Sequence, residues 1–151
     1  MKTRLVFILA ISIWLSGCDN SPYVHTFGET SAERVAVMTD IIKKRISLPG
    51  SILDAECIEE KYGGLLGPSE YNFFAKLVVE KTALASWKSS AGEKISSWDY
   101  FTPKNGLSWW LTREQADQLE MYSPKPMFGR RFGWVGFAAD GQTIYILTHA
   151  W

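Results

Sequence analysis

The sequence predicts an α+β domain in which an N-terminal helix packs on an antiparallel sheet of about four strands, with short helical insertions. Apolar residues first recur at three- and four-residue steps over residues 30–46, and then alternate with polar residues in later segments. A hairpin pattern closes the chain. Consecutive strands with helices gathered outside them are typical of an antiparallel sheet. We therefore expect a single globular domain over residues 30–151.

The predicted helix begins after Thr30, because Thr30 and Glu33 have the spacing of a capping box. The apolar residues that follow fall on one helical face: Val35, Met38, Ile42 and Ile46. Pro49 and Gly50 are expected to end the helix, since proline cannot continue it.

Two strands are predicted next. In the first, Leu53, Ala55 and Cys57 alternate with polar residues, and glycines at positions 63, 64 and 67 end it. The second has five apolar residues at alternating positions: Tyr71, Phe73, Ala75, Leu77 and Val79. Because Phe74 and Val78 occupy its other face, we expect this strand to be central. A short helix capped by Thr82 should follow it.

The remaining segments are an irregular aromatic stretch, a short helix and a hairpin. Residues 96–110 are irregular around Pro103. Thr112 and Gln115 form a second capping-box pattern, opening a helix to about Met121. Residues 131–139 and 142–148 then flank Asp140-Gly141, which favours a type I′ hairpin turn.

The first seventeen residues have the order of a signal peptide. Lys2 and Arg4 precede an uncharged stretch over residues 5–15, and small residues lead into Cys18. At 1.5 Å per residue, this stretch reaches only about 17 Å, against about 30 Å for a hydrocarbon core. It is therefore too short for a transmembrane helix.

Leu15-Ser16-Gly17-Cys18 resembles the lipobox of bacterial lipoproteins. The resemblance implies cleavage before Cys18, a covalent diacylglycerol on its thiol and an N-acyl chain, which together hold a protein stably on a membrane. An ordinary secretory signal is the alternative. Asp19 resembles the signal that retains lipoproteins in the inner membrane, facing the periplasm, with the outer membrane as the alternative. Residues 1–17 are then the signal peptide and 18–29 a lipidated tether.

Composition limits the partners of the cleaved chain. Without Lys2 and Arg4 it has 14 basic and 16 acidic side chains, and no basic run that would indicate nucleic acid or anionic lipid as a ligand. Cys57 is then the remaining cysteine, so an intramolecular disulfide is excluded. We expect Cys57 to be buried, with a reactive or intermolecular thiol as the alternative.

Catalytic and metal motifs are weak. Cys57 and His149 could form a nucleophile–base pair, but neither lies in a local motif. The acids form one cluster, which we interpret as a solvated strand face rather than a calcium site: Asp54, Glu56, Glu59 and Glu60. Neither a phosphate-binding glycine loop nor a Gly-x-Ser-x-Gly motif is present. We predict a non-enzymatic protein with no metal and no cofactor beyond the lipid.

The aromatic stretch supplies the candidate partner-binding residues: Trp98, Tyr100, Trp109 and Trp110. Tryptophan and tyrosine are enriched in interfaces, although the same rings can fill a core, as we expect for Trp134. The predicted function is a binding domain for an envelope protein. The alternatives are an immunity-type inhibitor of an envelope-targeting toxin, or an envelope enzyme acting on peptidoglycan or lipid. Residues 67–71 resemble patterns in uncharacterised small bacterial lipoproteins, which implies no residue-level role.

Overall fold

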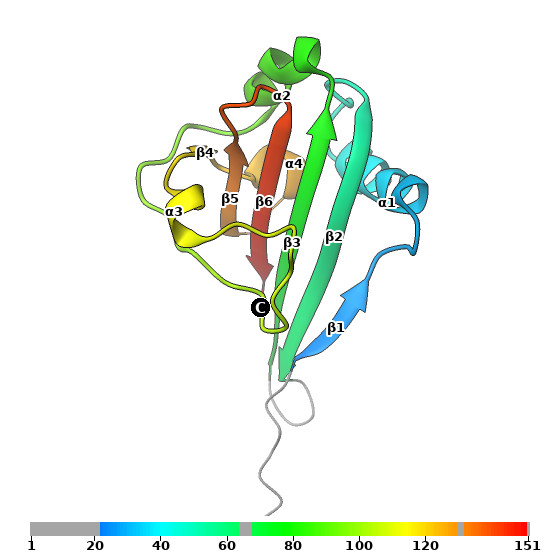
Figure 1. The fold of residues 1–151 in the computed structure, drawn as a ribbon, viewed down its shortest axis with the longest axis vertical. Coiled ribbons are helices and arrows are strands. Elements are labelled where there is room, and N and C mark those ends of the chain that lie inside the picture. The colour runs from blue at the N-terminus through cyan, green and yellow to red at the C-terminus, as the bar shows by residue number, and fades with distance from the viewer. Residues whose placement is uncertain (1–21, 64–67, 130–131, 151) are drawn as a thin grey trace, which may run out of the picture.

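The computed structural model describes residues 22–63, 68–129 and 132–150. These residues form one antiparallel sheet of six strands in the order β1-β2-β3-β6-β5-β4 (Figure 1). The strands are β1 (Tyr23–Thr26), β2 (Ile52–Gly63), β3 (Ser69–Val79), β4 (Glu120–Tyr122), β5 (Phe132–Phe137) and β6 (Thr143–Ala150). The helices are α1 (Ser31–Lys43), the 3-10 helix η1 (Lys81–Ala83), α2 (Leu84–Ser90), α3 (Arg113–Ala116) and α4 (Lys125–Phe128).

The predicted architecture, an N-terminal helix on a sheet of about four strands, is wrong. The sheet has six strands, and the first described element is strand β1 rather than a helix. The two strands that the sequence did not indicate, β1 and β4, are edge strands of four and three residues. Strands this short contain too few alternating positions to show a period of two.

Strand β1 also moves the start of the folded domain. It lies within the segment 18–29, which was predicted to be a tether, and it pairs with β2 from Tyr23 opposite Lys61 to Thr26 opposite Ile58. In the described part of the chain, the domain therefore begins at Tyr23 instead of Thr30.

Helix α1 has the predicted capping box. The Thr30 hydroxyl accepts a hydrogen bond from the Glu33 N–H, and the Glu33 carboxylate accepts one from the Thr30 N–H. The helix ends at Lys43, earlier than the predicted end near Pro49. Met38 and Ile42 are fully buried against the sheet. Arg34 links the helix to β2 by a hydrogen bond, in which its Nε donates to the Ala55 carbonyl oxygen over 2.6 Å.

Strand β3 is central, as predicted, since it pairs with β2 on one side and β6 on the other. One residue departs from the predicted alternation of β2. The register shifts between Ile52 and Asp54, and a bulge there turns a side chain away from the face it would otherwise share. Leu53 is consequently 55% exposed, whereas Ala55 and Cys57 are buried.

The β5–β6 hairpin is confirmed, but its turn is not type I′. A type I′ turn needs positive φ at two successive residues, and among the described residues of the turn only Gly141 has positive φ, at 79°. The turn is closed by Asp140, whose carboxylate accepts hydrogen bonds of 2.9 Å from the N–H groups of Gln142 and Thr143. Burial opposes ionisation of this carboxyl, but the hydrogen bonds outweigh it and hold the pKa of Asp140 below its usual value.

The short helices are shorter or differently capped than predicted. The helix expected from Thr82 is present as η1 and α2, but Thr82 does not cap either. The capping box of Thr112 and Gln115 is confirmed, yet α3 ends at Ala116 and Met121 lies in β4.

The sheet separates two hydrophobic clusters. The first lies on the face covered by α1, α2 and α4, which we call the helix face. The second lies on the opposite face, which is covered by residues 95–111 and α3 and which we call the aromatic face. We call residues 95–111 the aromatic segment; in Figure 1 it crosses in front of the sheet, while α4 lies behind it. Each face thus has its own hydrophobic core, which is covered by helices on one face and mainly by an irregular segment on the other.

Candidate functional site

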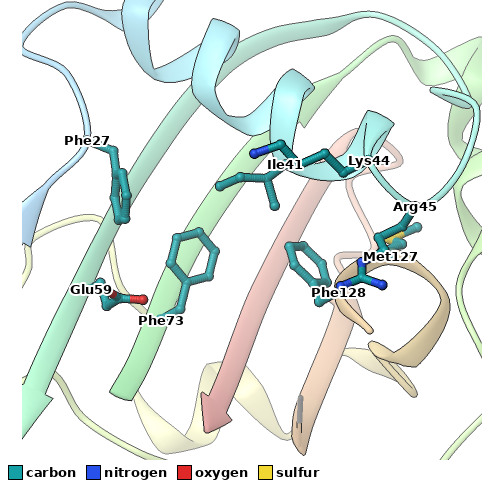
Figure 2. Close-up of a pocket in the computed structure, with 8 residues that line it drawn as sticks. All are labelled: Phe27, Ile41, Lys44, Arg45, Glu59, Phe73, Met127 and Phe128. Carbon is teal, nitrogen blue, oxygen red and sulfur yellow. The ribbon is translucent and has the colours of Figure 1, made fainter. Parts of the chain in front are cut away.

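A cavity of about 490 Å³ opens on the helix face, between α1, α4 and strands β2 and β3 (Figure 2). It lies where the cover is incomplete, because α1 ends at Lys43 and α4 contains only four residues. Its volume falls within the range of about 300–1,000 Å³ that is typical of small-molecule sites.

Three phenylalanine rings form the floor of the cavity. Phe27 and Phe73 meet edge to face with ring centroids 5.8 Å apart, and Phe73 and Phe128 are 6.2 Å apart. Phe73 and Phe128 are almost completely buried, at 2% and 6% exposed. Figure 2 shows the three rings side by side across the sheet, with Ile41 of α1 above them. The floor is therefore apolar and closely packed.

Charged side chains lie around this floor. Lys44 and Arg45 follow the end of α1, and Glu59 of β2 lies beside Phe73, its partner in the register. Gly129 makes room for Arg45, because a Cβ atom there would lie only 3.1 Å from the guanidinium carbon. With two cations and one carboxylate, the cavity suits a ligand that combines an apolar group with an anionic group.

The aromatic face places Trp110 in a core. Its side chain is only 8% exposed, and its ring stacks on Trp134 with a centroid distance of 5.8 Å and meets Phe74 edge to face at 5.0 Å. The indole N–H donates to the Phe101 carbonyl oxygen over 3.1 Å. Trp134 is fully buried, as predicted. A buried, hydrogen-bonded indole of this kind stabilises the fold and is not available to a partner.

The other three candidate residues lie around Trp110. Trp98 meets Trp134 edge to face at 5.8 Å and is covered by the Arg113 guanidinium at 4.7 Å. The Tyr100 hydroxyl donates to the Leu111 carbonyl oxygen over 2.6 Å. Trp109 packs on Trp110 at 5.8 Å. The structure thus brings all four predicted residues together, as the cover of a hydrophobic core.

Cys57 and His149 lie on opposite faces of the sheet. Cys57 is 1% exposed within the helix-face core, and burial raises the pKa of its thiol to about 11. His149 lies on the other face between the rings of Phe132, at 5.7 Å, and Phe101, at 5.5 Å. Burial lowers the pKa of His149, although Asp99 and Glu70 oppose this shift. A sheet separates the two side chains, so they do not form a nucleophile–base pair.

The predicted acid cluster is divided among separate roles. The Asp54 carboxylate accepts a hydrogen bond from the Ser31 hydroxyl, and Glu56 forms an ion pair with Arg34. Glu59 lines the cavity. Among the residues described, no three His, Cys, Asp or Glu side chains are grouped so that they could hold a metal ion.

Glu60 departs most from the predicted solvated strand face. Its side chain is fully buried, and its carboxylate accepts hydrogen bonds from the Tyr62 hydroxyl over 2.7 Å and from the Lys104 N–H over 2.8 Å. Burial, together with Glu60, raises the pKa of Tyr62 to about 12. Through its hydrogen bond with the Lys104 N–H, Glu60 links the aromatic segment to β2. The acidic sequence of β2 carries no signal for this, because the partner is a backbone group 44 residues away.

Two predicted residues, Cys18 and Asp19, lie outside the described residues. In the described ranges, no helix combines the length and the apolar character needed to cross a bilayer. Comparisons of the chain with family models, curated proteins and solved structures find no significant match.

Proposed function

We propose that this chain is a lipid-anchored, non-enzymatic binding protein of the bacterial envelope, held at the periplasmic face of the inner membrane through Cys18. The lipobox pattern of Leu15 to Cys18 supports the anchor, and Asp19 supports retention in the inner membrane. Two or more acyl chains suffice for stable residence on a membrane without a transmembrane segment.

The cavity on the helix face is the proposed binding site, and it is the single observation that carries the binding role. Its phenylalanine floor excludes water from an apolar group, while Lys44 and Arg45 attract an acidic one. The ligand class is therefore an amphiphile with an anionic head, such as a fatty acid or the acidic, apolar end of a peptide.

Two features favour binding over catalysis. Cys57 and His149 are separated by the sheet, and the thiol of Cys57 stays protonated at neutral pH because its pKa is raised to about 11. The carboxylates of Asp54, Glu56 and Glu60 are occupied by partners within the fold. The aromatic segment is less suited than the cavity to hold a ligand, since its central ring, Trp110, is buried.

The anchor is tested at Cys18. Wild-type chain expressed in a bacterium should give an N-terminal peptide that begins at Cys18 and carries the mass of the lipid. Cys18→Ser should remain an uncut precursor without lipid. A wild-type product that is processed but carries no lipid would show an ordinary secreted protein. Asp19→Ser should move the lipidated protein to the outer membrane, as measured by density-gradient separation.

The binding site is tested with dodecanoate as the probe, in isothermal titration calorimetry. Lys44→Glu/Arg45→Glu should weaken binding at least about tenfold, which corresponds to about 1.4 kcal/mol. Lys43→Glu is the matched control, because Lys43 neighbours Lys44 but does not line the cavity. Ile41→Trp should fill the cavity and reduce binding without a change of charge. Equal affinities of the wild type and the double variant would overturn the proposed site.

A further inference from the structure

We infer that the end of the sheet at which β1 begins contacts the bilayer. Tyr23, Phe101 and Phe132 then lie in the membrane–water interface. This inference rests on the lipid anchor of the proposed function. It concerns a contact surface that the anchor alone does not define, because a lipidated domain on a long tether can take any orientation.

The length of the tether restricts the orientation. Only five residue steps separate Cys18 from Tyr23, the first residue of β1, and an extended chain covers at most about 3.6 Å per residue, or about 18 Å. Strand β2 contains twelve residues and spans about 40 Å. The end of the sheet at which β1 begins therefore remains near the lipid, while the opposite end lies beyond the reach of the tether.

Exposed aromatic side chains gather at this same end. Among the described residues, four large apolar or aromatic side chains are exposed: Tyr23 (71%), Phe132 (56%), Leu53 (55%) and Phe101 (37%). Three of them are at the end near the tether, and Leu53 is at the other, next to Ile52 at the start of β2.

The register of the strands places the three aromatic residues together along the sheet axis. Residues that lie opposite one another on neighbouring strands form a row across the sheet. Tyr23 is in the row that continues through Lys61 and Tyr71 to Ala150. Phe132 lies opposite His149, one row further into the sheet. The ring of Phe101 is 5.5 Å from the ring of His149. All three aromatics are thus within about one residue of the same level along the strands.

The chemistry of this end fits the interfacial layer of a bilayer. Aromatic rings are enriched at the level of the lipid head groups, and lysines place their apolar stems there while the ammonium group reaches water. Lys61 and Lys104 lie at this end, with their ammonium groups 5.6 Å and 5.9 Å from the ring centroids of Tyr71 and Tyr62. A bilayer is the occupant that the short tether holds against this surface.

This orientation also places the cavity near the membrane. Glu59 and Phe73 of the cavity lie opposite each other, two rows from Tyr23 along the strands. Two residues of a strand span about 7 Å. An amphiphile leaving the periplasmic leaflet of the bilayer would therefore meet the cavity close to the membrane surface.

The test uses the full lipidated chain with one cysteine introduced at a time, labelled with a nitrobenzoxadiazole fluorophore. Cys57 is buried with a raised thiol pKa, so labelling is directed to the introduced position. The variants are Tyr23→Cys and Phe132→Cys, with Leu53→Cys as the control of similar exposure at the opposite end. Each is incorporated into phosphatidylethanolamine–phosphatidylglycerol vesicles that contain a lipid with a nitroxide near the head group.

We expect the nitroxide to quench the probes at positions 23 and 132 at least about threefold more strongly than the probe at position 53, because only the first two reach the interface. Equal quenching at all three positions, or no quenching at 23 and 132 while the protein floats with the vesicles, would overturn the inference and leave the anchor intact. A wild-type protein that does not float with vesicles would overturn the anchor and the inference together.

Discussion

The two faces of the sheet are covered in different ways. On the helix face, α1, α2 and α4 each bury one or two apolar side chains completely, and a cavity of about 490 Å³ is left beside α1 and α4. On the aromatic face, an irregular segment lays tryptophan and tyrosine rings directly on the strands. Backbone carbonyl oxygens of this segment accept hydrogen bonds from two indole N–H groups: Trp134 of β5 donates to Asp99 over 2.8 Å, and Trp110 donates to Phe101 over 3.1 Å.

The difference shows that one sheet can be covered closely on one face and incompletely on the other. A helix is a stiff cylinder, so short helices on a broad sheet leave gaps where they do not meet. An irregular chain can follow the surface of the sheet, provided that side chains or turns satisfy its backbone. The aromatic face is thus closed by packed rings, and the helix face retains an open cavity.

The largest expected effect is the loss of a central ring of the aromatic face. Trp110→Ala should lower the free energy of unfolding by about 3–5 kcal/mol, because it leaves a cavity among Phe74, Trp134 and Tyr145. Urea denaturation of the variant measures the loss. Trp109→Ala is the comparison, and its smaller burial should give a clearly smaller loss. Equal losses would show that Trp110 has no special place in this core.

The hydrogen bond that joins the aromatic segment to β2 can be tested by a substitution of Glu60. Glu60→Gln keeps the size of the side chain but can no longer accept both hydrogen bonds, and it should cost about 1–3 kcal/mol of stability. Amide hydrogen exchange should show faster exchange of the Lys104 N–H in the variant. Unchanged exchange at Lys104 would contradict the role assigned to Glu60. Glu59→Gln, on the other face, is the control.

The two capping boxes compare one helix from each face. Thr30→Ala and Thr112→Ala should each cost about 1 kcal/mol, because each removes a hydroxyl that accepts a helix N–H. Thr82→Ala should have almost no effect, since Thr82 caps no helix. Thermal unfolding measures all three variants. A loss at Thr82 as large as at Thr30 would contradict the described start of η1.

The smallest expected effect depends on pH. The pKa of Asp140 is lower in the folded protein than its ordinary value near 3.8, so its carboxylate contributes stability above that pH. The contribution is lost as pH falls through the lower folded value, where both states become protonated. The difference in stability between the wild type and Asp140→Asn should therefore shrink between pH 6 and pH 2.5. A difference that grows on acidification would reverse the sign of the shift.

Long, regular elements could be predicted from the sequence, and short or irregular ones could not. Helix α1, its capping box and the central position of β3 follow from local spacing and from apolar residues on both faces of the strand. Strands β1 and β4 were missed because they are short and derive their order from pairing with distant strands. The bulge at Leu53 likewise depends on the partner strand rather than on β2 itself.

The candidate site was less predictable than the fold. The aromatic residues were found, but composition does not distinguish a ring that faces a partner from one that faces a sheet. The cavity combines Phe27, Arg45, Glu59 and Phe128, which are spread over about a hundred positions of the chain. They form a site only because β2 and β3 pair and because α1, which ends at Lys43, and the four-residue α4 leave part of this face of the sheet uncovered. No local motif encodes such a gap.

We propose that the cavity on the helix face binds the ligand and that the aromatic face, closed by packed rings, does not. The most direct test is a nuclear magnetic resonance titration of ¹⁵N-labelled protein with dodecanoate. We expect shifts at the amides of Ile41, Glu59, Phe73 and Phe128, with the indole N–H signals of Trp110 and Trp134 unmoved. Shifts of the indole signals without changes around the cavity would contradict the claim and place the binding site on the aromatic face.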